Sequence, residues 1–181
     1  MGVDARAKKI KLLVLDVDGV LTDGQIIFGH DGELMKNFHC QDGLGVTAAH
    51  KAGLKTAIIT GRESQIVYLR STELKIMDVY QGAMNKGEAF MALLAKYNLT
   101  AQEAAYVGDD LVDLPVMMQA GLACAVDNAV PEVKKHAHFI AARKGGQGAV
   151  REVVEFILKS QGKWDDIVNA YLQGGKIESR Q

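Results

Sequence analysis

Two aspartates that stand one residue apart at the end of an apolar run are the strongest chemical signal in the chain. The run Leu12–Leu15 leads directly into Asp16, Val17, Asp18 and Gly19. Because residues i and i+2 of a strand point to the same side, the two carboxylates leave the strand together and repel each other. A divalent cation or a proton would relieve that repulsion. The alternative is a strand that simply ends in a polar turn, since Asp and Gly are common turn residues.

Polar residues also follow two later apolar runs, and a lysine stands where a helix is expected to begin. In a parallel sheet the carboxyl ends of the strands lie at one edge, so these residues are expected to meet the two aspartates there. Taken singly, each also has an ordinary explanation as a turn, a solvated lysine or a helix cap. The residues are Thr60, Gly61 and Arg62, then Lys86, then Asp109, Asp110 and Asp113.

An edge with this set of side chains favours phosphoryl chemistry. Oxygen ligands without His or Cys suit Mg²⁺, which typically uses a few carboxylates together with water and phosphate. The cation, Thr60, Lys86 and the N–H groups of a helix start would form a pocket for an anion. An aspartate beside the phosphoryl group can act as nucleophile, and a second can move the proton. The residues therefore predict phosphoryl transfer by a carboxylate, with Mg²⁺ as the cofactor.

The composition indicates one ordinary globular domain over residues 1–181. Hydrophobic residues make up 48% of the chain and the formal net charge is −1, so no overall field favours nucleic acid or an anionic membrane. No apolar run approaches the roughly 18 residues of a membrane span, and the first residues lack the apolar core of a signal peptide. We therefore expect a cytoplasmic protein. Two cysteines, Cys40 and Cys124, are too few for a disulfide framework.

Apolar runs alternate with helical patterns along the chain. This alternation predicts an α/β fold, a three-layer sandwich in which helices cover both faces of a mostly parallel sheet. The expected strands are Lys11–Asp16, Lys55–Thr60, Met77–Gln81, Ala105–Gly108, Leu122–Val126 and a short one near His138–Ala141. The expected helices begin near Asp42, Ser64, Lys86, Leu111, Val130 and Gly148.

One segment, about residues 24–40, interrupts this alternation. Its apolar stretches, Gln25–Phe28 and Leu34–Phe38, flank a glycine-containing turn, which predicts a β-hairpin. Since an isolated hairpin is marginal in water, its apolar side chains are expected to pack on something, and another subunit is a candidate. The C-terminal residues, about 174–181, are expected to form a flexible tail.

The order of the motifs resembles that of the haloacid dehalogenase-like phosphohydrolases. Four motifs agree in order and strand context over about residues 10–130, namely Asp16–Asp23, Thr60, Lys86 and Gly108–Asp113. The resemblance implies a Rossmann-like sandwich in which the small β-hairpin stands in place of a cap domain.

The resemblance also implies roles for single residues. Asp16 would attack phosphorus and form an aspartyl-phosphate, and Asp18 would protonate the leaving oxygen and then activate water. Mg²⁺ would be held by Asp16, the main-chain carbonyl of Asp18 and Asp109, while Thr60 and Lys86 would bind the phosphoryl oxygens. Two further aspartates, Asp110 and Asp113, are candidates for holding metal-bound water or orienting Lys86, and the sequence does not separate them.

Within the family, the resemblance extends over nearly the whole chain to one group of small-cap enzymes. The segments Gln41–Gly43, Thr60–Ser64 and Arg143–Glu152 are similar to those of phosphatases that act on an eight-carbon sugar acid phosphate on the route to bacterial lipopolysaccharide. Relatives form tetramers in which each hairpin docks near the next subunit's site, so a homotetramer is expected. Arg62 is a candidate partner for the substrate carboxylate, because a guanidinium binds carboxylates through two parallel hydrogen bonds.

Three alternatives stay open. The first is a phosphatase of a nine-carbon sugar acid 9-phosphate, which would share the motifs and differ only in the substrate pocket. The second is a non-catalytic regulator or scaffold with the same fold, against which the intact Asp16 and Asp18 argue. The third is a protein phosphatase, which an open site in a monomer would favour.

Overall fold

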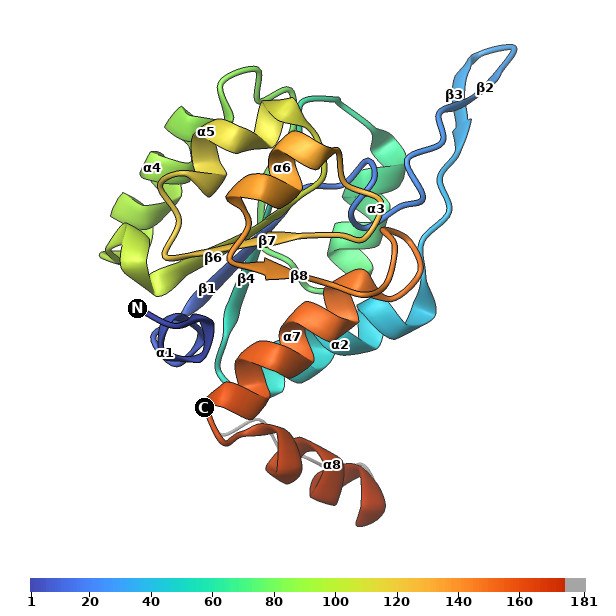
Figure 1. Cartoon of the computed structure of the whole chain (residues 1–181). Coiled ribbons are helices and arrows are strands. Elements are labelled where there is room, and N and C mark those ends of the chain that lie inside the picture. The colour runs from blue at the N-terminus through green and yellow to red at the C-terminus, as the bar shows by residue number, and fades with distance from the viewer. Residues whose placement is uncertain (175–181) are drawn as a thin grey trace.

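The computed structural model describes residues 1–174, which form a six-stranded parallel sheet with helices on both faces and a two-stranded hairpin (Figure 1). The predicted fold is therefore confirmed. The predicted tail at about 174–181 lies, apart from Gly174, outside the described residues. In order across the sheet the strands are β5 (Asp78–Tyr80), β4 (Lys55–Ile59), β1 (Leu12–Leu15), β6 (Ala104–Gly108), β7 (Leu122–Ala125) and β8 (Phe139–Ile140).

Strand β1 lies in the middle of the sheet and is buried along its whole length. It pairs with β4 on one side and β6 on the other, so its side chains face helices on both faces, which explains the unbroken apolar run. Leu15 pairs with Val107, and the N–H of Asp16 then donates to the carbonyl of Val107 at 3.1 Å. This register makes the polar residues after β1 and β6 emerge side by side.

The helices cover the two faces of the sheet in two sets (Figure 1). One set contains α4 (Lys86–Tyr97), α5 (Leu114–Met117) and α6 (Pro131–His136), and the other contains α2 (Cys40–Lys51) and α7 (Ala149–Ser160), which pack against each other. The predicted apolar stripe of α7 is buried, since Val150, Val153, Val154, Ile157 and Leu158 are all inaccessible to solvent. Within residues 1–174, no helix has both the length and the apolar composition that crossing a bilayer requires.

Two features of the helices differ from the sequence prediction. Helices α1 (Val3–Ala7) and α8 (Trp164–Leu172) were not predicted, because such short segments carry little periodicity and depend on tertiary packing. The helix expected at Leu111 is a 3₁₀ turn, η2 (Leu111–Asp113), followed by α5. The short 3₁₀ turn before β6, η1 (Ala101–Glu103), has the capping box that its sequence favours, between Thr100 and Glu103. Helix α3 (Gln65–Glu73) begins where expected, with Ser64 as its N-cap.

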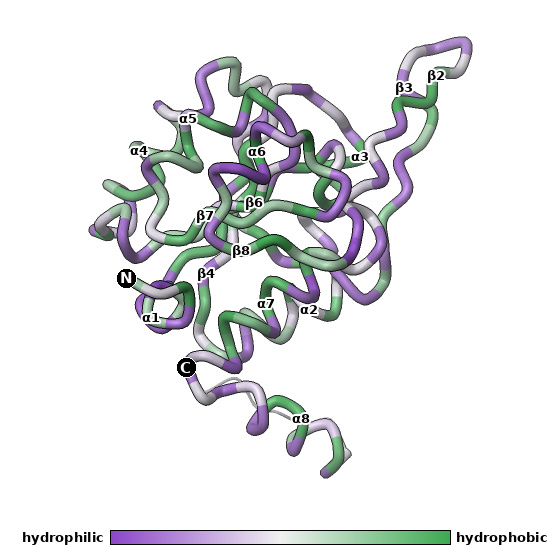
Figure 2. The backbone as a smooth tube through the Cα atoms, in the orientation of Figure 1, coloured by the Kyte–Doolittle hydropathy of each residue, from purple (hydrophilic) through white to green (hydrophobic). Residues whose placement is uncertain are grey.

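The predicted hairpin is present and projects from the body of the molecule (Figure 1). Its strands are β2 (Ile27–Gly29) and β3 (Gly32–Met35), which pair antiparallel. Figure 2 shows hydrophobic stretches within this arm, and Phe28 and Leu34 are 65% and 61% exposed. The outer part of the hairpin therefore presents apolar surface.

Helix α7 takes the cap for its first turn from another helix. Its N-cap residue, Gly148, has φ +100° and carries no side chain that could accept a hydrogen bond. Asp42 of α2 accepts from the backbone N–H of Gly148 at 3.2 Å and of Arg151 at 2.8 Å. Burial raises the pKa of Asp42, although these N–H groups favour its charged form. Asp42 thus joins α2 to α7 by satisfying N–H groups that the helix leaves free.

Replacing Asp42 should therefore destabilise the fold. We expect Asp42→Ala to lower the free energy of unfolding by about 1–2 kcal/mol, the usual range for the loss of a helix cap, and Asp42→Asn to lower it less because one acceptor oxygen remains. Urea denaturation measures both. Asp127→Ala is the matched control, since within residues 1–174 the Asp127 side chain makes only a long ion pair with Lys134 (3.9 Å). Equal losses in the two alanine variants would contradict the assignment.

Candidate active site

The polar residues predicted at the strand ends converge on one cavity of about 270 Å³ at the carboxyl edge of the sheet. Asp16 follows β1, Thr60 follows β4, Lys86 begins α4 and Asp109 follows β6. The structure thus brings together every site residue that the sequence predicted. The cavity is lined by Asp16, Asp18, Gly24, Thr60, Gly61, Arg62, Lys86, Asp109, Asp110 and Val112.

Three carboxylates crowd together at the base of this site. One oxygen from each of Asp16, Asp109 and Asp113 lies within 4.8 Å of the others. Burial, and then the negative charge of Asp113, raises the pKa of Asp16 to about 6, while Lys86 opposes the shift. Burial followed by the charges of Asp113 and Asp16 raises the pKa of Asp109 to about 7. The cluster is therefore short of positive charge.

Lys86 supplies the positive charge that the protein itself provides. Its Nζ lies 2.8 Å from Oδ2 of Asp16 and 2.7 Å from Oδ1 of Asp113, and the side chain is 4% exposed. Burial alone would lower the pKa of Lys86, but the two carboxylates outweigh it and raise the pKa above the ordinary value. Lys86 is thus held as an ammonium group between the carboxylates of Asp16 and Asp113.

Asp113 anchors this arrangement, because both of its oxygens are already used. Oδ1 accepts from Lys86 and from the Tyr106 hydroxyl, each at 2.7 Å, and Oδ2 accepts from the backbone N–H groups of Asp109 (2.8 Å) and Asp110 (3.2 Å). Asp110 instead caps the 3₁₀ turn through the N–H of Leu111. Of the two aspartates that the sequence left open, Asp113 is therefore the one that orients Lys86.

The remaining carboxylate oxygens fit a divalent cation. Within residues 1–174, Oδ1 of Asp16 and Oδ1 of Asp109 are buried and have no hydrogen-bond partner. A buried anion without a partner is costly, and oxygen donors of this kind are the ligands that Mg²⁺ takes. Gly19 leaves room beside them, since a Cβ on this residue would lie 2.0 Å from Oδ2 of Asp109. The donor set therefore fits Mg²⁺.

Asp18 lies on the rim of the cavity and has a neighbour that the sequence analysis did not single out. Lys36, just after β3 of the hairpin, places its Nζ 2.5 Å from Oδ1 of Asp18. Arg62 approaches Oδ2 of the same carboxylate at 3.9 Å. Tyr106 was missed in the same way, because it lies inside an apolar strand where an aromatic residue is typical of the core.

The glycine-rich segment before α7 packs behind the site rather than lining it. A Cβ on Gly145 would lie 1.7 Å from the carbonyl oxygen of Gly19, and the N–H of Gly146 donates to the carbonyl of Val20 at 3.0 Å. This segment therefore packs directly against the turn that carries Asp18. It requires glycine because the two backbones are too close for a side chain between them.

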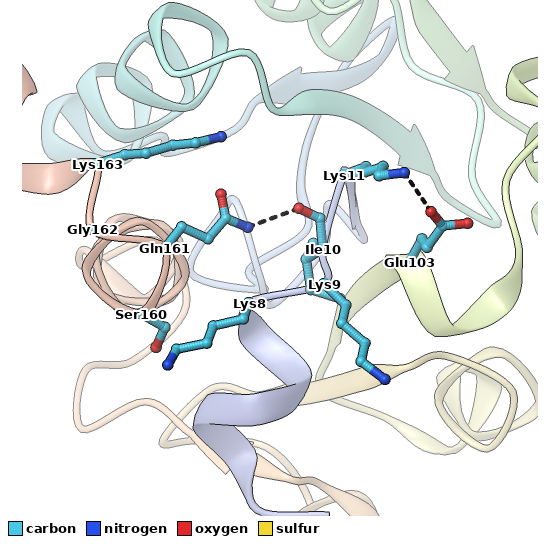
Figure 3. A pocket seen from close by; sticks show the side chains of 9 residues that line it. All are labelled: Lys8, Lys9, Ile10, Lys11, Glu103, Ser160, Gln161, Gly162 and Lys163. Atoms are coloured by element: carbon cyan, nitrogen blue, oxygen red, sulfur yellow. Dashed lines mark hydrogen bonds and ion pairs between the residues drawn. The ribbon is translucent and has the colours of Figure 1, made fainter.

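A larger hollow of about 850 Å³ lies at the opposite, amino edge of the sheet (Figure 3). Its polar groups are largely occupied within the protein. Lys11 pairs with Glu103 at 2.6 Å, Nε2 of Gln161 donates to the carbonyl of Ile10, and Lys163 donates to the carbonyl of Ala52. Among the described residues that line it, Glu103 alone carries a carboxylate, so the cluster of carboxylates lies at the carboxyl edge.

Comparison with known proteins agrees with this geometry. The sequence model of a family described as haloacid dehalogenase-like hydrolase matches residues 58–153. The 3-deoxy-D-manno-octulosonate 8-phosphate phosphatase of Escherichia coli (strain K12) is 46% identical over 164 residues, which cover 91% of this chain and 87% of the relative. The enzyme of the same name from Yersinia pestis is 44% identical over 87% of this chain and 84% of the relative.

A solved structure leads to the same family. The crystal structure of 3-deoxy-D-manno-octulosonate 8-phosphate phosphatase from Moraxella catarrhalis, in complex with magnesium, phosphate and the sugar acid KDO, superposes with a TM-score of 0.91 at 41% identity. The match covers 93% of this chain and 97% of that one. The chain belongs to the haloacid dehalogenase-like hydrolases, in the family of the 3-deoxy-D-manno-octulosonate 8-phosphate phosphatases.

Proposed function

We propose that this protein hydrolyses 3-deoxy-D-manno-octulosonate 8-phosphate (KDO 8-phosphate) to KDO and inorganic phosphate, with Mg²⁺ as cofactor. The observation that carries the proposal is the pair of buried, unpartnered oxygens on Asp16 and Asp109, beside the Lys86 ammonium group. The relatives named above support the substrate, since one of them binds magnesium, phosphate and KDO together.

Two aspartates would carry the reaction. A carboxylate oxygen of Asp16 attacks phosphorus, the bond between phosphorus and the sugar oxygen breaks, and an aspartyl-phosphate forms. The Asp18 carboxyl gives its proton to the departing sugar oxygen. In the second step Asp18 takes a proton from water, the water oxygen attacks phosphorus, and Asp16 is released together with phosphate. Asp18 thus returns to its starting state.

Other groups would bind and orient the substrate. Mg²⁺, held by Asp16, Asp109 and the main-chain carbonyl of Asp18, would neutralise negative charge on the phosphoryl group. Lys86 and Thr60, which both line the cavity, would bind phosphoryl oxygens. Gly61 lines the same cavity, and the 45% exposed side chain of Arg62 is free to pair with the sugar acid carboxylate.

The nine-carbon sugar acid 9-phosphate is the second candidate substrate, and a non-catalytic role is the third possibility. The same site residues would serve either ester, so a direct comparison of kcat/KM for the two esters decides between them. We expect KDO 8-phosphate to be preferred. A preference for the nine-carbon ester would overturn the choice of substrate while leaving the chemistry intact.

We further infer that the protein acts as a homotetramer in the cytoplasm, on the route to lipopolysaccharide. Membership of the family supports the location and the route. The hairpin supports the assembly, because several exposed apolar side chains lie close together on it, and such a patch favours contact with another protein surface. The exposed apolar residues on this arm are Ile26 (45%), Phe28 (65%), Leu34 (61%) and Met35 (45%).

The nucleophile can be tested by one substitution. Asp16→Asn should lower kcat by more than about 10³-fold, because loss of a catalytic nucleophile typically costs at least this much. The variant should stay folded, since Lys86 keeps Asp113 as a partner and one of three crowded charges is gone. Steady-state phosphate release and thermal melting measure the two effects. An unchanged rate would exclude Asp16 as the nucleophile.

The metal site predicts a pH-dependent stabilisation. The raised carboxyl pKa values, about 6 for Asp16 and about 7 for Asp109, mean that the metal-free fold binds protons more tightly than the unfolded chain. Their stabilising effect is complete below the unfolded pKa of 3.8 and is lost as the pH rises through about 6 to 7. Above that range the cation replaces the protons, so Mg²⁺ should raise Tm more at about pH 8 than at about pH 5.5.

Differential scanning calorimetry with and without Mg²⁺ checks this expectation. At a concentration of 100 times Kd the cation should add about 2.7 kcal/mol of stability at the higher pH. Asp109→Asn should remove most of the shift, whereas the control Asp127→Asn, at a half-exposed side chain, should keep it. An equal shift at both pH values would refute competition between protons and metal at these carboxylates.

The assembly can be tested on the hairpin. Light scattering should give a mass four times that of the 19.6 kDa chain. The double variant Phe28→Asp, Leu34→Asp should shift this mass towards the monomer, because buried apolar contacts would be replaced by like charges. Met77→Asp, on an 85% exposed residue of the main body, is the control. A wild-type monomer would refute the tetramer and favour the protein-phosphatase reading of an open site.

A further inference from the structure

We infer that Lys36 of the hairpin is a positioning residue for Asp18, and that it turns this carboxylate so that one oxygen faces the substrate. The inference rests on the proposed function, in which Asp18 moves the proton. It assigns the hairpin a task in its own subunit's site, in addition to any contact that it makes with a neighbour.

The contacts divide the two oxygens of Asp18 between different partners. Oδ1 lies 2.5 Å from Nζ of Lys36, which is hydrogen-bond distance. Among the described residues, Oδ2 is approached by a cation only at the 3.9 Å distance of Arg62. Asp18 lines the cavity. Oδ1 is therefore fixed by the protein, and Oδ2 is left to exchange a proton with the sugar oxygen or with water.

The surroundings of Lys36 suit a fixed group. Its side chain is only 1% exposed, and its Nζ also lies 2.8 Å from Oε1 of Glu33. Arg62 is 45% exposed on its side chain, so it is free to move with substrate. Lys36 is thus the permanent partner of Asp18.

The chain of contacts continues into the segment that would bind phosphate. Oε2 of Glu33 accepts a hydrogen bond from the hydroxyl of Ser64, the N-cap of α3. That residue lies four positions after Thr60. Asp18, Lys36, Glu33 and Ser64 therefore link three segments: the turn after β1, the hairpin, and the loop after β4. A shift of the hairpin would move Asp18, and small displacements of a reacting group cost rate.

The leaving group of the substrate separates a positioning role from a merely structural one. KDO 8-phosphate releases an alkoxide oxygen that needs a proton, whereas 4-nitrophenyl phosphate releases a stable phenolate that does not. Single turnovers with enzyme in excess, followed by release of KDO or 4-nitrophenol, report only the first step. We expect Lys36→Met to slow KDO release by about 10–100-fold and 4-nitrophenol release by less than about threefold.

Variants control for damage to the fold. Lys36→Arg keeps a charged donor and should recover part of the KDO rate, and Lys36→Gln serves if the Met variant does not fold. Lys11→Met is the matched control, since it breaks an ion pair with Glu103 at the opposite edge of the sheet, and it should change neither rate. Equal slowing of both substrates by Lys36→Met or Lys36→Gln would overturn the inference.

The same assay separates failure of the inference from failure of the proposed function. If the wild-type protein releases no KDO, the proposed substrate is wrong. The comparison of Lys36→Met with wild type is then made on a simple alkyl phosphate against 4-nitrophenyl phosphate. Selective slowing of the alkyl ester would still support Lys36 as the residue that positions Asp18, and equal slowing would still refute it.

Discussion

Repulsion among carboxylates at one edge of the sheet is the constraint around which the site is arranged. Asp16, Asp109 and Asp113 approach one another because β1 and β6 are neighbours in register. Lys86 offsets part of the charge, and Tyr106 with two backbone N–H groups stabilises Asp113. What is left is negative charge on buried oxygens, which a divalent cation relieves. The repulsion lowers the stability of the metal-free fold, and in return the carboxylate oxygens are already in place to bind a metal ion beside the phosphate site.

The hairpin links the surface proposed for contact between subunits to the candidate active site. Its outer side chains are apolar and exposed, which suits contact between subunits. Its inner end carries Lys36, which contacts Asp18, the proposed acid–base carboxylate, and Glu33, which contacts Ser64, the cap of α3. The same short arm thus connects the surface proposed for contact between subunits to Asp18. The arm is small, but Lys36 and Glu33 both contact residues on segments that line the candidate site.

Much of this arrangement could be predicted from sequence, because strand ends are local features. Apolar runs located the strands, and the polar residues after them, Asp16, Thr60 and Asp109, had only one edge on which to meet. Lys36 and Tyr106 could not be found in this way, since their roles depend on contacts with residues that local patterns do not connect. The choice between Asp110 and Asp113 likewise required the hydrogen bonds of both oxygens. Short helices α1 and α8 escaped because propensity is weak over so few residues.

The cap that α2 provides for α7 has a consequence for the order of folding. A 12-residue helix is marginal on its own in water, and the acceptor for its first turn lies 109 residues earlier in the chain. During synthesis, Asp42 leaves the ribosome long before Arg151 does. The capping contact can therefore form only after most of the domain has been synthesised, and α2 and α7, which pack against each other, gain their stability together.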